Sequence, residues 1–308
     1  MHSPWGDLAV SDAHVHFFSH SFFANLASQA QATVESLGPT LNWQMPDQDP
    51  EHLAATWVRE LDRHGVTRAA LIASVPGDHE SVIAAVRRFP QRFHGYVMVN
   101  PTAAEALAGV NAALDSGHVQ GLCFFPAMHR YSIQDERVAA LLELAEGRLS
   151  NGRSPVVFVH CGVLSVGVRK KLGLPSPFDM KFSNPIDLHA VAMRHPGMQF
   201  VVPHFGAGYF REVLMLCDLC PNVWLDTSSS NSWMRYAGAH LDLREVFRRA
   251  LDVIGPNRLL FGTDSSFFPR GWNSQVYDNQ TTALYEAGLK LEAAQLIFHH
   301  NLTRLLTS

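Results

Sequence analysis

The chain has 308 residues, of which 47% are hydrophobic and 17% charged, a composition that suits a large folded core and excludes a disordered protein. A formal net charge of −4, with no run of Lys and Arg, excludes an electrostatic footprint for nucleic acid or an anionic membrane. No apolar run reaches membrane-spanning length, and the N-terminus, Met1–Asp7, lacks the pattern of a signal peptide. We therefore expect a cytoplasmic protein that binds neither nucleic acid nor membrane.

Short runs of β-branched and aromatic residues alternate along the chain with longer segments of helical pattern. The predicted strands are Leu8–His14, Ala69–Ser74, Phe93–Val99, Gln120–Phe125, Val156–His160, Gln199–Pro203, Val223–Asp226 and Leu259–Thr263. The predicted helices are Pro50–His64, Asp78–Phe89, Ala103–Asp115, Asp135–Glu146, Pro185–His195, Gly208–Cys220, Leu243–Ile254, Thr281–Gly288 and Leu291–Leu306. Because parallel strands need crossover connections, eight strand-helix units predict an α/β protein of the (β/α)8 TIM barrel type.

An open, doubly wound α/β sheet is the alternative architecture. Such sheets that bind dinucleotides carry a Gly-rich turn after the first strand. In this sequence the turn after the first predicted strand holds histidines instead, which favours the barrel.

One connection is much longer than the others. It runs over residues 17–49, between the first strand and the helix Pro50–His64, and contains several aromatic residues and the pairs Gly38-Pro39 and Met45-Pro46. A long insertion at a barrel mouth is more often a lid or pocket wall than a domain. We therefore expect one domain over residues 1–308, with residues 17–49 as a lid or pocket wall.

Position along the chain separates functional histidines from ordinary ones. The sequence has 17 histidines, but the functional residues of this fold lie where strands end and loops begin. Four histidines and one carboxylate meet that criterion: His14, His16, His160, His204 and Asp264.

The pair His14 and His16 ends the first predicted strand. Residues i and i+2 of an extended strand face the same way, so two imidazoles at this spacing can bind one metal ion. Asp12 shares the parity of the pair, and we expect it either to support a ligating histidine or to cap the strand.

The ends of the first, fifth, sixth and eighth strands meet at one rim of a barrel. Three imidazoles and a carboxylate suit Zn, with Mn or Fe as alternatives, and leave a position open for water. The sequence thus predicts a divalent metal site formed by His14, His16, His160 and Asp264.

Four motifs in this order resemble those of the amidohydrolase superfamily. They are Asp12-Ala13-His14-Val15-His16, Phe158-Val159-His160, Pro203-His204-Phe205-Gly206 and Phe261-Gly262-Thr263-Asp264. More narrowly, the chain is similar to the amidohydrolase 2 branch, which includes aminocarboxymuconate semialdehyde decarboxylase and related non-oxidative decarboxylases. The segment Asn301–Leu306 is similar to the end of that branch. The resemblance covers nearly the whole chain and is specific for the superfamily but not for a substrate.

The resemblance implies a role for each of these positions. His14, His16, His160 and Asp264 would bind the metal, and His204 would lie beside the metal water as a catalytic base or electrostatic partner. Two-metal members carry a carboxylated Lys at the end of strand four, where this chain has Gly121–Pro126 and no Lys. The resemblance therefore implies one ion per chain, and it also suggests a homodimer.

The expected chemistry follows from the metal, which brings the pKa of bound water toward neutrality. A neighbouring His204 or Asp264 can then move the proton. The first interpretation is a metal-dependent hydrolase of a small organic acid, lactone or amide. The alternative is a metal-dependent non-oxidative decarboxylase of an unsaturated or aromatic acid. A third is a non-catalytic barrel with a structural metal, against which the presence of both His204 and Asp264 counts.

The expected substrate is a small planar or compact molecule with at least one carboxylate. Arg270 lies just past the eighth strand, beside Phe267, Phe268 and Trp272, and an Arg fork binds a carboxylate well. Trp272 is expected to be a pocket wall or to pack the loop. The other candidates for substrate binding are Arg211 and Phe125, while each Arg could instead be an ordinary surface residue.

Overall fold

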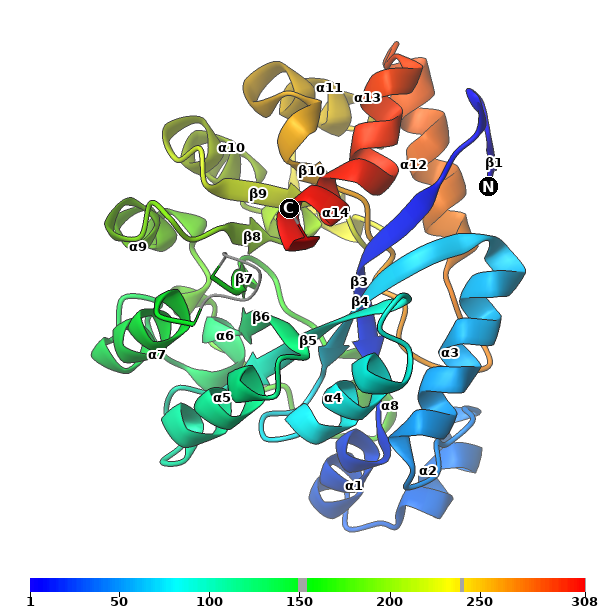
Figure 1. Cartoon of the computed structure of the whole chain (residues 1–308), viewed down its shortest axis with the longest axis vertical. Helices are drawn as coiled ribbons and strands as arrows, with labels where there is room; N and C mark the ends of the chain where they lie inside the picture. Colours follow the sequence, from blue (N-terminus) through cyan, green and yellow to red (C-terminus); the bar gives the residue numbers. More distant parts are fainter. Residues whose placement is uncertain (149–153, 239–240, 308) are drawn as a thin grey trace.

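A computed structural model describes residues 1–148, 154–238 and 241–307 of the chain, and its centre is a sheet of eight parallel strands (Figure 1). The strands pair with their neighbours in chain order from β3 to β10. Their bounds are β3 (Val10–Phe17), β4 (Val66–Ala73), β5 (Phe93–Val99), β6 (Val119–Phe124), β7 (Val156–Val159), β8 (Phe200–Val202), β9 (Val223–Asp226) and β10 (Leu259–Leu260). A small hairpin of β1 (His2–Ser3) and β2 (Gly6–Asp7) precedes them.

The two ends of the sheet meet, so the sheet forms a nearly closed barrel. The Ala13 N–H donates to the Phe261 carbonyl at 2.8 Å, and the His16 N–H donates to the Ser265 carbonyl at 2.7 Å. The Asp264 N–H donates a hydrogen bond to the His14 carbonyl at 3.0 Å. The prediction of a TIM barrel is confirmed, and the open doubly wound alternative is wrong.

Helices cover the outside of the barrel (Figure 1). Their bounds are α3 (Pro50–His64), α4 (His79–Arg88), α5 (Ala106–Asp115), α6 (Pro126–His129), α7 (Glu136–Glu146), α9 (His189–Arg194), α10 (Phe210–Leu219), α11 (Leu243–Ile254), α12 (Ser274–Glu286), α13 (Leu291–Gln295) and α14 (Asn301–Thr307). Several start at a residue whose side chain accepts a hydrogen bond from the first turn, as Asp49, Asp135 and Asp242 do. The helix predicted over Leu291–Leu306 is interrupted by a π-helical turn at Leu296–His300.

The barrel has two apolar layers. Inward side chains such as Ile72, Phe158 and Trp224 fill its interior together with Leu302 and Leu305 of α14, which covers one end. Outward side chains of the strands pack against the surrounding helices in a larger cluster that includes Val15 and Trp272. The α14 end is therefore filled, and the histidines lie toward the other end.

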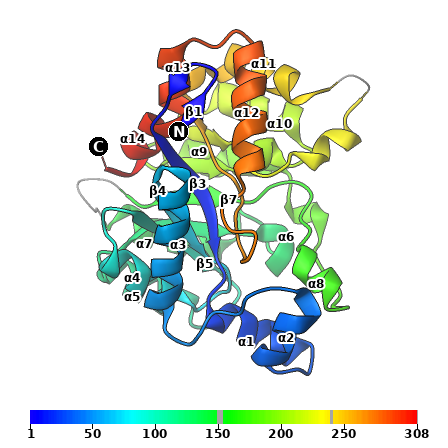
Figure 2. The same ribbon diagram turned by 90° about the vertical axis from the view of Figure 1, so that its right-hand side faces the viewer.

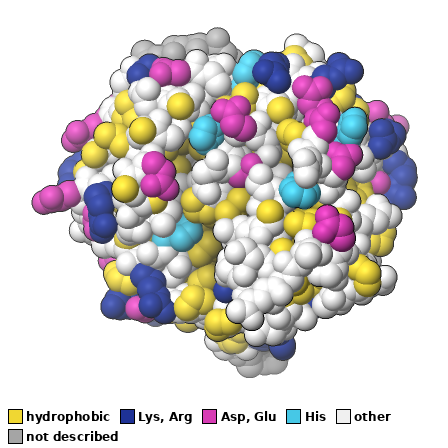
Figure 3. Space-filling view, turned by 90° about the horizontal axis from the view of Figure 1, so that it is seen from below, with side chains coloured by type: hydrophobic (Ala, Val, Ile, Leu, Met, Phe, Trp, Pro, Cys, Tyr) yellow, Lys and Arg dark blue, Asp and Glu magenta, His cyan; other side chains and the backbone are white. Residues whose placement is uncertain are grey.

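Two inserted segments together form a wall at the open end. After β3 the chain forms α1 (His20–Gln29) and α2 (Val34–Leu41), and between β7 and α9 it forms α8 (Gly167–Lys171). Figure 2 shows these three helices together at one end of the molecule. Their apolar side chains share one cluster: Phe22, Phe23, Leu26, Leu37, Leu41 and Val168. On the face seen in Figure 3, hydrophobic side chains lie exposed in a hollow near the centre, beside a histidine.

Within the three described ranges, no helix combines the length and the apolar character that crossing a membrane requires.

The register of β5 against β6 allows a test with two glycines. A Cβ added at Gly95 on β5 would lie 2.5 Å from the carbonyl oxygen of His118, whereas one added at Gly109 on α5 meets no atom within 4 Å. We expect Gly95→Ala to lower the free energy of unfolding by about 1–3 kcal/mol through overpacking. Gly109→Ala should raise it by about 0.5–1 kcal/mol, because alanine is the better helix former. Urea unfolding measures both, and equal effects would contradict this packing.

Candidate metal centre

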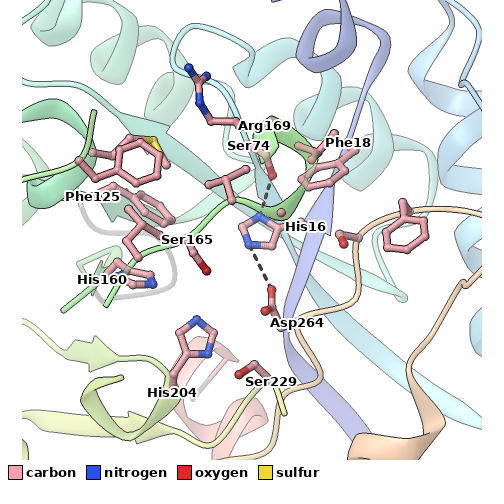
Figure 4. Close-up of a pocket in the computed structure, with 18 of the residues that line it drawn as sticks. His16, Phe18, Ser74, Phe125, His160, Ser165, Arg169, His204, Ser229 and Asp264 are labelled. Atoms are coloured by element: carbon pink, nitrogen blue, oxygen red, sulfur yellow. Dashed lines mark hydrogen bonds and ion pairs between the residues drawn. The ribbon is translucent and has the colours of Figure 1, made fainter. Parts of the chain in front are cut away.

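Three predicted ligands meet at the open end of the barrel. The Nε2 atoms of His14 and His16 are 3.4 Å apart. Oδ1 of Asp264 lies 3.7 Å from the first and 3.4 Å from the second (Figure 4). Among the described His, Cys, Asp and Glu residues, these three form the group whose ligand atoms all lie within 4.8 Å of one another. The His-x-His spacing therefore has the geometric consequence that the sequence predicted.

The hydrogen bonds of the two histidines determine which nitrogen faces this point. Nδ1 of His16 lies 2.8 Å from the Ser74 hydroxyl, whose own proton goes to the Ile72 carbonyl. The hydroxyl must therefore accept a proton from Nδ1, which leaves a lone pair on Nε2 of the neutral ring. Burial lowers the pKa of His16 to about 3, so the ring is neutral at pH 7.

Asp226 orients His14 in the same way. Oδ2 of this fully buried carboxylate lies 2.6 Å from Nδ1 of His14 and accepts its proton. Burial opposes both charges, but the pair outweighs it, so the pKa of Asp226 is lowered and that of His14 is raised. A carboxylate behind a histidine fixes the tautomer and makes the other nitrogen a better metal ligand.

Asp226 was not among the predicted site residues, although its position follows the rule that selected Asp264. Asp226 is a carboxylate at the end of a predicted strand, the seventh. Nothing in the sequence indicates that this strand end lies next to His14, because strand seven is not adjacent to strand one in the barrel. The pairing of His14 with Asp226 becomes visible only when the barrel is closed.

His160 and His204 lie on the other side of the same pocket (Figure 4). The ring centroid of His204 is 5.0 Å from that of His14 and 5.3 Å from that of His160. His160 thus stands outside the group of three. Its Nδ1 is buried without a hydrogen-bond partner among the described residues, and a buried imidazole nitrogen is costly unless it binds something. A metal ion, or a water molecule bound to it, would provide the missing partner of this nitrogen.

Ser228 connects the two halves of the site. Its hydroxyl oxygen lies 3.0 Å from Nδ1 of His14 and 2.9 Å from Nδ1 of His204. Its backbone N–H donates to Oδ1 of Asp226 at 2.7 Å. One serine therefore contacts the ligand, the carboxylate behind it and the expected base, which holds their relative positions.

Close backbone approach also builds the site. A Cβ added at Gly262 would lie 2.9 Å from the Cβ of His14 and 2.9 Å from Oδ1 of Asp226, so a side chain there would push both apart. Asp264 has φ 58° and His204 has φ 56°, a left-handed conformation that costs free energy in non-glycine residues. The chain accepts this cost at two of its predicted functional residues.

Asp12 does not share the orientation of the histidine pair. In the pairing of β3 with β4, Asp12 stands opposite Ala69 and Val15 opposite Leu71, so β3 contains one extra residue between them. This bulge breaks the alternation on which the parity argument rests. The Asp12 carboxylate accepts the His14 backbone N–H at 2.9 Å but does not contact either ring as a hydrogen-bond partner.

Trp272 was predicted to be a pocket wall and is instead buried outside the cavity. Its indole N–H donates to the Asp12 carboxylate at 2.7 Å, and its ring packs in the outer layer against Phe261 and Tyr277. An indole N–H needs a partner when it is buried, and the bulge at Asp12 supplies one. Burial also raises the pKa of Asp12 to about 6.

Arg211 was the other misplaced residue. Its side chain is 84% exposed on α10 and pairs with Glu212 at 2.6 Å. It lies on a shallow surface groove with Met215 and Arg249, away from the histidines. Seven residues after His204, the chain has left the loop at the barrel mouth, so Arg211 lies on the outer helix α10.

Phe125 and Arg270 do line the cavity that contains the histidines, which has a volume of about 940 Å³. The Phe125 ring stacks on His160 with centroids 5.4 Å apart. The Arg270 guanidinium donates to the Asp264 carbonyl at 3.2 Å and to the Ser266 hydroxyl at 3.1 Å. A cation therefore stands at the edge of the pocket beside one predicted ligand.

Both inserted segments contribute to the cavity wall. The segment predicted as a lid or wall supplies Phe18, Phe22 and Trp43. The second segment, over residues 161–184, supplies a longer run of lining residues that includes Ser165 and Arg169. This second wall was not predicted, because residues 161–184 carry no motif.

Comparison with known proteins identifies a family and one curated relative. A family model described as Amidohydrolase matches residues 11–307. Protein fluG of Emericella nidulans is 30% identical over 135 residues, a match that spans 40% of this chain and 15% of that protein.

Solved structures share the fold. An uncharacterised TIM-barrel protein from Bordetella bronchiseptica has a TM-score of 0.64 at 19% identity, covering 97% of this chain and 98% of its own. A probable 2-pyrone-4,6-dicarboxylic acid hydrolase from Acinetobacter baumannii has a TM-score of 0.58 at 14% identity, covering 98% and 100%. An amidohydrolase from Burkholderia multivorans with bound zinc has a TM-score of 0.57 at 16% identity, covering 97% and 99%. With nearly its whole length matched by the family model, the chain belongs to the amidohydrolase family, in the amidohydrolase 2 branch that its motifs resemble.

Proposed function

We propose that this protein is a metal-dependent hydrolase of a small organic acid, lactone or amide. The observation that carries the proposal is the convergence of two Nε2 lone pairs and the Asp264 carboxylate on one point of the pocket. A divalent cation at this point would be attracted by all three ligand atoms at once. The Acinetobacter protein described as a probable hydrolase and the zinc-containing Burkholderia amidohydrolase agree with this interpretation.

The donor set favours one divalent ion, with zinc as the first choice and Mn or Fe as alternatives. Imidazole nitrogen and carboxylate oxygen are ligands that these ions accept, and zinc sites in enzymes commonly have three protein ligands. His14, His16 and Asp264 would hold the ion, and His160 is the proposed fourth ligand. The barrel position of the Lys that bridges two ions in other members lies on β6, which contains no Lys.

When bound, the ion would supply Lewis acidity and lower the pKa of a water molecule beside it. Burial lowers the pKa of His204, so its ring is neutral at pH 7 and can accept a proton. Asp264 is partly exposed to the same cavity and can take or pass on that proton. Arg270, beside Asp264, would orient an acidic substrate through a charge-assisted hydrogen bond.

A non-oxidative decarboxylase of an unsaturated or aromatic acid is the second candidate. The observation that favours it is the position of Arg270, which would place a substrate carboxylate next to the histidine cluster. Both reactions use the same residues, so the products distinguish them. Release of carbon dioxide supports the lyase, and appearance of a carboxylate with an amine from an amide, or of a hydroxy acid from a lactone, supports the hydrolase.

Metal content tests the site first. We expect about one zinc ion per chain by elemental analysis after the chelator-treated protein is reloaded, because one group of ligands converges. His16→Ala should lose the ion. His52→Ala, which changes an exposed histidine outside the site, should keep it. Two ions per chain, or none, would contradict the mononuclear site.

The roles of His160 and His204 can be separated. His204→Ala should keep most of the metal and lose most of the turnover, because we assign His204 to proton transfer. His160→Ala should lose both metal and turnover. Metal content and turnover measured on the same preparations decide this, and the assignment is wrong if His204→Ala removes the ion as completely as His160→Ala.

Arg270 should act on the substrate and not on the metal. A Lys cannot reproduce the two parallel hydrogen bonds of an Arg fork, and a charge-assisted contact contributes roughly 1.5–3 kcal/mol. Arg270→Lys should therefore lower kcat/KM on an acidic substrate by about one to two orders of magnitude. Arg211→Lys is the matched control, since Arg211 lies outside the pocket and should leave kcat/KM unchanged. An unchanged kcat/KM in Arg270→Lys would remove it from the substrate site.

A further inference from the structure

The charged residues around the pocket are strongly unbalanced. Arg169, Lys171, Arg235 and Arg270 line it, whereas Asp264 is the one acidic residue among the described lining residues. The chain as a whole has a net charge of −4. In the described part of the chain, none of these four cations forms an ion pair within 4.0 Å, although many surface arginines do. Uncompensated charge of one sign in a cavity concentrates ligands of the opposite sign.

Two of these cations lie on α8, well away from Arg270 in the sequence. Arg169 donates from Nε to the Pro175 carbonyl at 2.9 Å and from Nη1 to Gln29 Oε1 at 2.8 Å. Both acceptors are neutral, so they orient the guanidinium without cancelling its charge. Figure 4 shows Arg169 at the opposite side of the drawn pocket from His204, with Ser165 between them.

An aromatic pair connects the two cationic regions. Trp43 and Phe267 stack with ring centroids 3.9 Å apart and an interplanar angle of 12°. Lys171 Nζ lies 5.3 Å from the centroid of Trp43, and the Arg270 guanidinium carbon lies 4.5 Å from that of Phe267. Contact with a ring face holds a cation in place and leaves its charge available. Three segments far apart in the sequence, one of them α8, thus fix one cation at each ring of the pair.

The cavity is larger than a compact carboxylic acid needs. Its volume of about 940 Å³ lies at the upper end of the roughly 300–1,000 Å³ that is typical of pockets for drug-sized ligands. Its walls are rich in aromatic side chains, which include Phe18, Phe22, Trp43, Phe125, Phe178 and Phe267. An apolar, planar segment would fit against such walls.

We propose that the pocket binds an extended anion with a negatively charged group at each end. One group reaches Arg270 beside the histidine cluster, and this part of the proposal rests on the proposed function. The other reaches a second subsite formed by Arg169 and Lys171 on α8, and the aromatic walls contact the apolar part between them. The second group is a carboxylate or a phosphate, since both bind a guanidinium and an ammonium.

Matched probes test the second subsite without turnover. Calorimetry on zinc-loaded protein would compare benzoate with terephthalate, and biphenyl-4-carboxylate with biphenyl-4,4′-dicarboxylate. In at least one of the two pairs the second carboxylate should tighten binding about tenfold, as one charge-assisted contact would. If 4′-phosphonobiphenyl-4-carboxylate binds tighter still, the second group is a phosphate. No advantage for the second charge in either pair would overturn the proposal.

Variants on α8 locate the effect. Arg169→Met and Lys171→Met should each remove most of the advantage of the second charge and leave the affinity for the monocarboxylate unchanged. Lys170→Met is the control, because Lys170 is exposed on the same helix and is not a lining residue. Arg169→Met also loses the contact with Gln29, which could lower the affinity for the monocarboxylate as well. In that case the result for Lys171→Met decides whether the second subsite exists. An equal loss in Lys170→Met would overturn the subsite. Zinc content and hydrolysis, measured separately, show whether the proposed function itself fails.

Discussion

The site depends on one electrostatic constraint, the convergence of lone pairs from His14 and His16 with the Asp264 carboxylate. Each histidine is held in that orientation from behind, one by Asp226 and the other by Ser74. The surrounding structure therefore holds the three ligand atoms close together. Ser228, which contacts His14 and His204 together, is part of that support.

Closure of the barrel places Asp264 next to the two histidines. The first and last strands exchange hydrogen bonds at the residues that carry the ligands, so Asp264 is fixed to the backbone of His14 by its own N–H. Gly262 allows this approach because it has no Cβ, and the left-handed backbone of Asp264 turns its carboxylate toward the pocket. The closing contacts of the barrel therefore also position the proposed metal ligands.

Strand ends were predictable from the sequence, because hydrophobic runs followed by His or Asp mark them clearly. That rule selected His16, His160, His204 and Asp264, which line one pocket, and His14, which contacts His16 beside it. Two other predictions were wrong: an extra residue in β3 changed the parity at Asp12, and Arg211 is exposed on α10 outside the pocket. The contact of Asp226 with His14 and the burial of Trp272 depend on neighbours that only the closed barrel brings together, and the wall at α8 has no motif of its own.

Anomalous diffraction from zinc-loaded crystals, recorded on either side of the zinc absorption edge, would locate the ion itself. We expect one peak per chain, within about 2.0–2.2 Å of Nε2 of His14, Nε2 of His16 and a carboxylate oxygen of Asp264. His204 should lie outside this coordination shell. A peak elsewhere, two peaks in the pocket, or His14 or His16 bound through Nδ1 would contradict it.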